Sequence, residues 1–372
     1  MAAQNFPVID ADGHVQELHI DWAGRIAPEV RDRAPRVGRN KQGFPMLLAE
    51  GKLWPKPEGP GLGQAGGARS RKPAETTGMW DPVRRLQDMD LEGIDTAVLF
   101  GTTLFLSLAF FEDLDLAAAS ARVYNDWLAE YCATDSRRLK GIALVPLQDP
   151  PAAVAELRHA VEDLGFVGVG TPAHAGGRNL DHPDLDPFYA EAERLGVPVC
   201  VHVGAGRPAA AAERFDNPFM VHVTTHAFEQ MIGAMCVVAG GVLERHPRLK
   251  VAFLEAGAGW VPYWMERLDE HYEYMQPAVP WLTREPSDYL RSSQVYYSFE
   301  PDERTLPFVL QFVGEDRFVF ASDYNHSDCK FPDTVRHMRA RTDLAPDTLR
   351  RVMSENARAL YALQPAPAAA PS

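Results

Sequence analysis

Residues 7–14 read PVIDADGH, a short run of strand-forming residues that ends in polar side chains. Seven further runs of this kind occur along the chain, and helix-forming stretches such as 116–134, 151–164, 186–195 and 229–245 lie between them. Nearly continuous apolar runs are typical of strands covered on both faces, and alternation of strands with helices predicts a parallel sheet or barrel. The eight predicted strands are 7–11, 96–100, 141–145, 166–170, 198–202, 251–255, 295–299 and 318–322.

Eight strand and helix pairs predict a (β/α)8 TIM barrel, an α/β fold that we expect to occupy residues 5–362 as a single domain. The connections after the first and sixth strands are too long for a loop and one helix, so they predict insertions over the barrel mouth. The first of them is rich in Pro, Gly, Lys and Arg; we expect either an irregular lid over residues 35–80 or disordered surface. The tail, 364–372, is low in complexity and is expected to be disordered.

The composition is that of a globular protein, with 46% hydrophobic and 24% charged residues. A net charge of −14 argues against nucleic acid or anionic membranes as partners. The sequence shows neither a membrane span nor a signal peptide, and its four cysteines form no C-x-x-C pair. We therefore expect a cytoplasmic protein with free thiols and a small-molecule substrate.

Several predicted strands end in residues that can bind metals. In a barrel these carboxyl ends meet at one mouth, where active sites are built. Asp12 and His14 are two residues apart in the first strand, so both side chains point to one side, and Asp10 would join them. Buried carboxylates and imidazoles need partners, so their convergence predicts a cation site. The candidate ligands are Asp12, His14, His202, His226, Glu255, Asp323 and His326.

Other candidates lie near the same strand ends. In the segment TTHAFE, Thr225 is a plausible helix cap, which favours His226 as an inward residue and leaves His222 to cap or pack. His174 follows the fourth strand and is a weaker candidate for substrate contact, with an ordinary loop histidine as the alternative. The aromatic residues Trp80, Tyr324, Trp260 and Tyr297 either line the pocket or pack in the core.

Motifs along nearly the whole chain resemble one family of enzymes. They are VIDADGHV, WDPVRRLQDMDLEGID, DHPDLDPFYAEAERLGVPVCVHVG, VLERHPRLKVAFLEAGAGWVPYW, RFVFASDYNHSD and ENARALYAL. The chain resembles the amidohydrolase-related metal-dependent barrels, which include the aminocarboxymuconate-semialdehyde and γ-resorcylate decarboxylases. The resemblance implies metal ligation by Asp12, His14, His202 and Asp323.

The chain departs from this family at two positions. It has Asp12-Gly13-His14 where many members have His-x-His, and Glu255 where they often have a catalytic histidine. Additional carboxylates suit manganese or iron better than zinc, although zinc also fits. Seven candidate ligands exceed the number that one four-coordinate ion with an open position uses. We therefore expect one or two divalent transition metals, two ions accounting best for the number.

This ligand pattern resembles dinuclear non-haem oxygenases of the family, which favours an iron or manganese monooxygenase with O₂ as co-substrate. The alternative is a mononuclear hydrolase or a non-oxidative decarboxylase of a small carboxylic acid. In either case the expected catalytic residues are Glu255, Asp323 and His226. A non-catalytic subunit that supports a paralogue is a third hypothesis, disfavoured by the complete ligand set. A homodimer or an assembly with a paralogous subunit is also consistent with the sequence.

Overall fold

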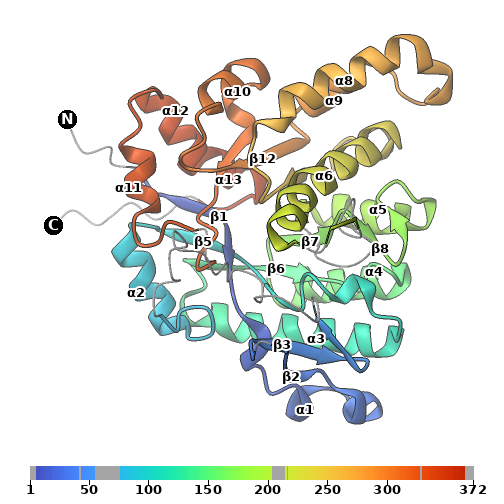
Figure 1. Cartoon of the computed structure of the whole chain (residues 1–372), viewed down its shortest axis with the longest axis vertical. Coiled ribbons are helices and arrows are strands. Elements are labelled where there is room, and N and C mark those ends of the chain that lie inside the picture. Colours follow the sequence, from blue (N-terminus) through green and yellow to red (C-terminus); the bar gives the residue numbers. More distant parts are fainter. Residues whose placement is uncertain are drawn as a thin grey trace.

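The computed structural model describes residues 6–41, 43–54, 76–202, 214–215, 217–326 and 329–364. Eight parallel strands follow one another around a single sheet, and Figure 1 shows helices packed around its outside. The strands are β1 (Ile9–His14), β5 (Thr96–Phe100), β6 (Leu139–Leu144), β7 (Gly168–Pro172), β10 (Val199–His202), β11 (Val251–Phe253), β12 (Val295–Phe299) and β13 (Phe318–Phe320). Each overlaps one predicted strand.

Backbone hydrogen bonds join the end of the sheet back to its beginning. The N–H of Asp323 donates to the carbonyl of Asp12 (3.1 Å), and the N–H of His14 donates to the carbonyl of Tyr324 (2.7 Å). The sheet is therefore a nearly closed barrel, and the predicted (β/α)8 fold is confirmed. Its core consists of the apolar strand residues and the inner faces of the helices.

Pairs of an Asx residue and proline begin three of the helices. Asp81, Asp149 and Asn217 each accept a hydrogen bond from a backbone N–H in the first turn, and a proline follows each of them. Both features stabilise a helix start. The longer helices are α2 (Pro82–Glu92), α3 (Leu114–Cys132), α4 (Pro150–Arg158), α5 (Asp186–Leu195), α6 (Pro218–Ala239), α8 (Trp260–Met275) and α10 (Leu306–Val313). The shorter helices include α1 (Trp22–Arg25), α7 (Val242–Arg245), α9 (Pro286–Leu290), α11 (Thr334–Arg339), α12 (Pro346–Arg350) and α13 (Asn356–Leu360).

The expected helix start at Thr225 is wrong. Helix α6 begins at Pro218, capped by Asn217, so His222 and His226 lie one turn apart within it. The Thr225 hydroxyl donates to the carbonyl of Val221 inside the helix. The sequence TTHAFE carries a local capping signal, but the Asn–Pro pair upstream provides a better one.

Part of the first long connection forms a regular sheet, so the expectation of irregular or disordered structure is wrong for that part. Strands β2 (Arg36–Arg39), β3 (Pro45–Ala49) and β4 (Lys52–Trp54) pair antiparallel. Residues 55–75 of the proposed lid lie outside the described residues, as does the predicted disordered tail after residue 364. The second long connection holds helices α8 and α9. Among the described helices, none has both the length and the apolar character needed to cross a membrane.

A buried polar network holds the first strand against the last. Both carboxylate oxygens of Asp10 accept hydrogen bonds from Ser322, one from its backbone N–H (2.8 Å) and one from its hydroxyl (2.6 Å). The guanidinium of Arg85, on α2, lies 3.8 Å from Asp10 and donates to the carbonyl of His14 (3.0 Å). Asp10 is therefore part of the barrel closure and does not join Asp12 and His14 as expected.

Replacing Arg85 tests this network. Arg85→Ala leaves the Asp10 carboxylate buried without its counter-charge, so the free energy of unfolding should fall by about 3–5 kcal/mol in urea denaturation. The control is Arg137→Ala, because Arg137 is exposed and pairs with Asp135 on the surface; it should cost less than about 1 kcal/mol. Equal losses in the two variants would contradict a structural role for the buried pair.

Candidate metal centre

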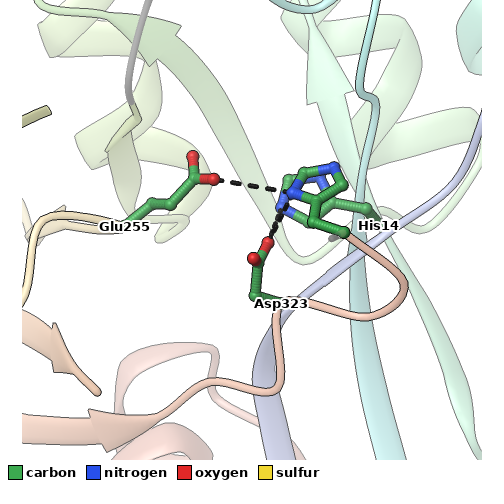
Figure 2. Close-up of side chains that lie close together, drawn as sticks. His14, Glu255 and Asp323 are labelled. Carbon is green, nitrogen blue, oxygen red and sulfur yellow. Dashed lines mark ion pairs between the residues drawn. The ribbon is translucent and has the colours of Figure 1, made fainter. Parts of the chain in front are cut away.

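Six of the seven predicted ligands converge at the carboxyl ends of four strands. His14 ends β1 and His202 ends β10, whereas Glu255 follows β11 by two residues. Asp323 and His326 lie in the segment that follows β13. Figure 2 shows the carboxylates of Glu255 and Asp323 turned toward the ring of His14. The barrel therefore gathers residues that are up to 314 positions apart in the sequence, as between Asp12 and His326.

The first group of potential ligand atoms comprises Asp12, His14 and His202. The two oxygens of Asp12 face different histidines: Oδ1 lies 3.5 Å from Nε2 of His14, and Oδ2 lies 3.5 Å from Nε2 of His202. All three side chains are nearly inaccessible to solvent. Oδ1 of Asp12 and Nε2 of His14 make no hydrogen bond to any described residue, which is costly for buried polar atoms. A cation between them would satisfy both.

The second group comprises His14, Glu255, Asp323 and His326. Oδ1 of Asp323 lies 2.6 Å from Nδ1 of His326 and 3.3 Å from Nε2 of His14. Oε1 of Glu255 lies 3.5 Å from Nδ1 of His326. The rings of His14 and His326 stack with their centroids 4.1 Å apart. The two groups therefore share His14 and form one continuous cluster.

Hydrogen bonds that two of the imidazoles donate to the segment after β5 fix their orientation. Nδ1 of His14 lies 3.1 Å from the carbonyl of Gly101, which can only accept, so Nδ1 carries the proton and the lone pair of Nε2 faces the cluster. The Thr102 hydroxyl donates to the carbonyl of Val15 (2.8 Å), so its oxygen is the acceptor for Nε2–H of His326 (3.4 Å). Nδ1 of His326 then faces the carboxylates. Such outer hydrogen bonds are typical of metal-binding histidines.

Burial and the neighbouring charges strongly shift the pKa values of the side chains in the cluster. Burial lowers the pKa of His14 well below its usual value, and the neighbouring His326 and His202 lower it further. Burial alone would lower the pKa of His326, but Asp323 and Glu255 hold it well above its usual value. Burial also opposes ionisation of Glu255, yet His202 and His326 keep its pKa well below the usual value. The carboxylates thus require positive charge beside them.

His226 lies beside this cluster but belongs to neither group of ligand atoms among the described residues. It is half-buried on α6, and its charge lowers the pKa of Glu255. Its Nδ1 donates to the carbonyl of His222 (2.8 Å), and its ring stacks on that of His222. His226 is therefore near enough to Glu255 to interact with it, whereas its role as a ligand stays a prediction.

The weaker substrate candidates have different positions. The hydroxyl of Tyr324 donates to Asp88 (2.5 Å) and its ring packs on Arg85, so this side chain packs against α2. Substrate contact by Tyr324 stays a prediction. Trp80 is half-buried and stacks on His19. His174 lies two residues beyond Pro172, which pairs with His202 in the sheet. Its Nε2 lies 3.6 Å from Oε2 of Glu229. Substrate contact by Trp80 and His174 stays a prediction.

Three residues around the site were not predicted from the sequence. The first is Thr102, whose oxygen accepts the hydrogen bond of His326. Its sequence signal is the run FGTT at residues 100–103, which places polar residues directly after the second predicted strand. Lys330 lines a small cavity beside Asp12, Glu255 and Asp323, and its ammonium group lies 2.9 Å from Asp302. Ser298, on β12, accepts the N–H of Glu255 (2.9 Å) and so fixes the backbone at that position.

Comparison with known proteins places the chain among enzymes built on this barrel. The family model described as "Amidohydrolase" matches residues 9–363. The chain belongs to the amidohydrolase family. It is similar to the γ-resorcylate decarboxylase of Rhizobium radiobacter, with 32% identity over 64% of this chain and 75% of the relative. It is also similar to the 2-amino-3-carboxymuconate-6-semialdehyde decarboxylase of Dictyostelium discoideum, with 28% identity over 66% of this chain and 67% of the relative.

A solved structure agrees with these matches. The crystal structure of 2,6-dihydroxybenzoate decarboxylase complexed with 2,6-dihydroxybenzoate is 31% identical, covering 75% of this chain and 87% of its own, with a TM-score of 0.67. The predicted amidohydrolase-related family is thus confirmed, and the chain is a metal-dependent enzyme of that family. The named relatives are decarboxylases, so they give no support to the favoured monooxygenase.

Metal removal should reveal the centre as a stability effect. Free Mn²⁺ at 100 times its Kd should raise the free energy of unfolding by about 2.7 kcal/mol, and a chelator should reverse this, because the ion binds only the folded chain. His202→Ala and Asp323→Ala should fold but lose this stabilisation and the bound metal. His271→Ala, a histidine on α8 outside both groups, should retain both. Full metal retention in either ligand variant would contradict the assignment.

Proposed function

We propose that this protein is a metal-dependent, non-oxidative decarboxylase of a small aromatic or unsaturated carboxylic acid. The observation that carries this proposal is the buried convergence of Asp12, His14, His202 and Asp323 in a chain whose relatives include γ-resorcylate decarboxylase. The non-oxidative alternative from the sequence is therefore preferred to the oxygenase.

The residues present fit a divalent cation. Nε2 of His14 and Oδ1 of Asp12 are buried without a hydrogen bond to any described residue, and the lone pair of Nε2 is directed into the cluster by Gly101. Asp12, His14, His202 and Asp323 would hold the ion. Their mixture of imidazole and carboxylate suits manganese, iron or zinc. When bound, the ion supplies Lewis acidity that polarises a substrate oxygen.

Decarboxylation also requires a proton at the carbon that loses the carboxyl group. His226 is the candidate donor, because it lies beside Glu255 and its Nδ1 donates to the backbone carbonyl of His222, which leaves Nε2 as the atom that exchanges the proton. The C–C bond to the carboxyl group breaks and CO₂ leaves. The electron pair of that bond remains on the carbon, where it forms the new C–H bond with the proton from His226. Glu255 stabilises the protonated imidazole between turnovers.

Lys330 is the candidate for holding an anionic group of the substrate near this proton donor. Its side chain lines the cavity that adjoins Asp12, Glu255 and Asp323, and an ammonium group is a strong partner for a carboxylate or phenolate. Asp302, 2.9 Å from the ammonium, fixes its position.

The reaction class is testable without knowing the exact substrate. Metal-loaded enzyme should release ¹³CO₂ from carboxyl-labelled hydroxybenzoates, beginning with 2,6-dihydroxybenzoate, at equal rates with and without O₂. O₂ is not needed, because the two electrons of the broken C–C bond stay in the new C–H bond of the product. Stoichiometric O₂ consumption with a hydroxylated product would instead support the monooxygenase, which the extra ligands Glu255 and His326 favour.

A substitution on α6 tests the proton donor. His226→Gln should reduce kcat by about 10²–10⁴-fold, the usual contribution of general acid catalysis, while the bound metal and KM change little. His222→Gln is the matched control one turn earlier on the same helix, and it should retain most of the activity. An unchanged kcat in His226→Gln would remove His226 from the mechanism.

A further inference from the structure

Glu17 is a fully buried carboxyl group that binds the main chain of one loop, residues 101–105. Its Oε2 accepts a hydrogen bond from the backbone N–H of Thr103 (2.8 Å), and its Oε1 accepts one from the N–H of Phe105 (3.3 Å). Burial raises the pKa of Glu17, and hydrogen bonds from main-chain N–H groups oppose this shift. A buried carboxyl group needs such partners, so Glu17 and the loop stabilise each other.

The first half of this loop binds two imidazoles of the cluster. The carbonyl of Gly101 accepts the hydrogen bond from Nδ1 of His14 (3.1 Å). The hydroxyl oxygen of Thr102 accepts the one from Nε2 of His326 (3.4 Å). The position of the loop therefore decides which nitrogen of each ring faces the other side chains of the cluster.

The far end of the loop contacts the third imidazole. The ring of Phe105 packs edge-on against that of His202, with the centroids 5.2 Å apart and the planes at 82°. Phe105 is buried, and its N–H is one of the two that Glu17 binds. The loop thus contacts all three imidazoles of the candidate metal centre, and Glu17 holds it at the end beside His202.

We propose that Glu17 is a positioning residue of the metal centre. By binding the N–H groups of Thr103 and Phe105, it fixes the loop that orients the three imidazoles, although it does not itself contact the ion. This proposal rests on the proposed function for the existence of the metal site, and it adds a residue through which the ligands are oriented.

Gly101 makes the close approach of Glu17 to the loop possible. A Cβ atom at this position would overlap with Oε1 of Glu17 and would lie 3.0 Å from the ring of Tyr124. Glycine is the residue that allows a backbone to approach another group so closely. The carboxyl group of Glu17 therefore occupies the space that any other residue at position 101 would need.

Two side chains of the loop bind the segment that carries Glu17. The hydroxyl of Thr102 donates to the carbonyl of Val15 (2.8 Å), and the hydroxyl of Thr103 donates to Oε1 of Gln16 (3.1 Å). Glu17 continues this series of contacts to the far end of the loop. Outer hydrogen bonds of this kind fix the ring orientation of metal-binding histidines, and their loss usually weakens metal binding.

The affinity of the apoprotein for Mn²⁺ tests this role without an assay of activity. Glu17→Gln replaces one acceptor oxygen by an amide NH₂ group, which cannot accept a main-chain N–H. The loop should lose one of its two anchors, and the affinity for Mn²⁺, measured by titration calorimetry, should fall about 10–100-fold. Circular dichroism should show that the variant is folded.

The tautomer of His14 gives a readout that general destabilisation would not change. Its Nε2 lies 3.3 Å from Asp323, which favours a proton on Nε2, whereas Gly101 favours one on Nδ1. In ¹⁵N-histidine-labelled apoprotein, the His14 signal, assigned with His14→Gln, should be that of the Nδ1–H tautomer. In Glu17→Gln it should become a mixture of both tautomers.

A second variant displaces Glu17 from the opposite side. Gly101→Ala places a methyl group where Oε1 of Glu17 lies, so it should lower the Mn²⁺ affinity and mix the tautomers as Glu17→Gln does. The matched control is Glu191→Gln, because Glu191 is a buried glutamate on α5 that binds Arg158 and Arg194. It should lower the melting temperature but leave the affinity and the tautomer unchanged.

The outcomes distinguish this proposal from the proposed function. Wild-type Mn²⁺ affinity and a retained Nδ1–H tautomer in folded Glu17→Gln, or in Gly101→Ala if that variant alone folds, would overturn the role of Glu17 and leave the decarboxylase intact. An equal loss of affinity in Glu191→Gln would overturn it as well. No binding of Mn²⁺ by the folded wild-type protein would overturn both proposals.

Discussion

Three carboxylates and three imidazoles meet inside the barrel mouth, where burial removes most of the water that would otherwise solvate them. Isolated buried charges are among the most unfavourable features that a protein can contain. Here the carboxylates and imidazoles compensate one another only in part, since Asp12 and His14 each retain a buried atom without a hydrogen bond to any described residue. Binding of a cation between them would resolve this conflict.

The barrel brings the residues of this cluster together by placing each of them at the end of a strand or in the segment directly after it. Parallel strands place their carboxyl ends at one mouth, so each side chain needs only a short extension of a strand to reach its neighbours. The contacts that close the barrel also align the site: Arg85 bonds to the backbone of His14, and Ser322, next to Asp323, bonds to Asp10. The stability of the barrel and the geometry of the cluster are therefore coupled at the junction of the first and last strands.

The sequence predicts the strands and the convergence of six of the seven candidate ligands, because both depend on short patterns that a parallel barrel strongly constrains. Asp10 was assigned wrongly because the register shifts in β1 between Asp10 and Gly13, and such a bulge redirects side chains that simple alternation would align. The sequence predicts the wrong start for α6 because two capping signals compete, one at Thr225 and one at Asn217. The direction of Tyr324 and the support from Thr102 depend on contacts with distant segments, which no local pattern reveals.

Diffraction from manganese-loaded crystals tests the central claim most directly. An anomalous difference map collected above the manganese absorption edge should show its strongest density at the carboxyl ends of β1 and β10, between Asp12, His14 and His202. Crystals of metal-loaded protein with no anomalous density at these residues, or with density only elsewhere on the molecule, would contradict the account of this cluster as a metal centre.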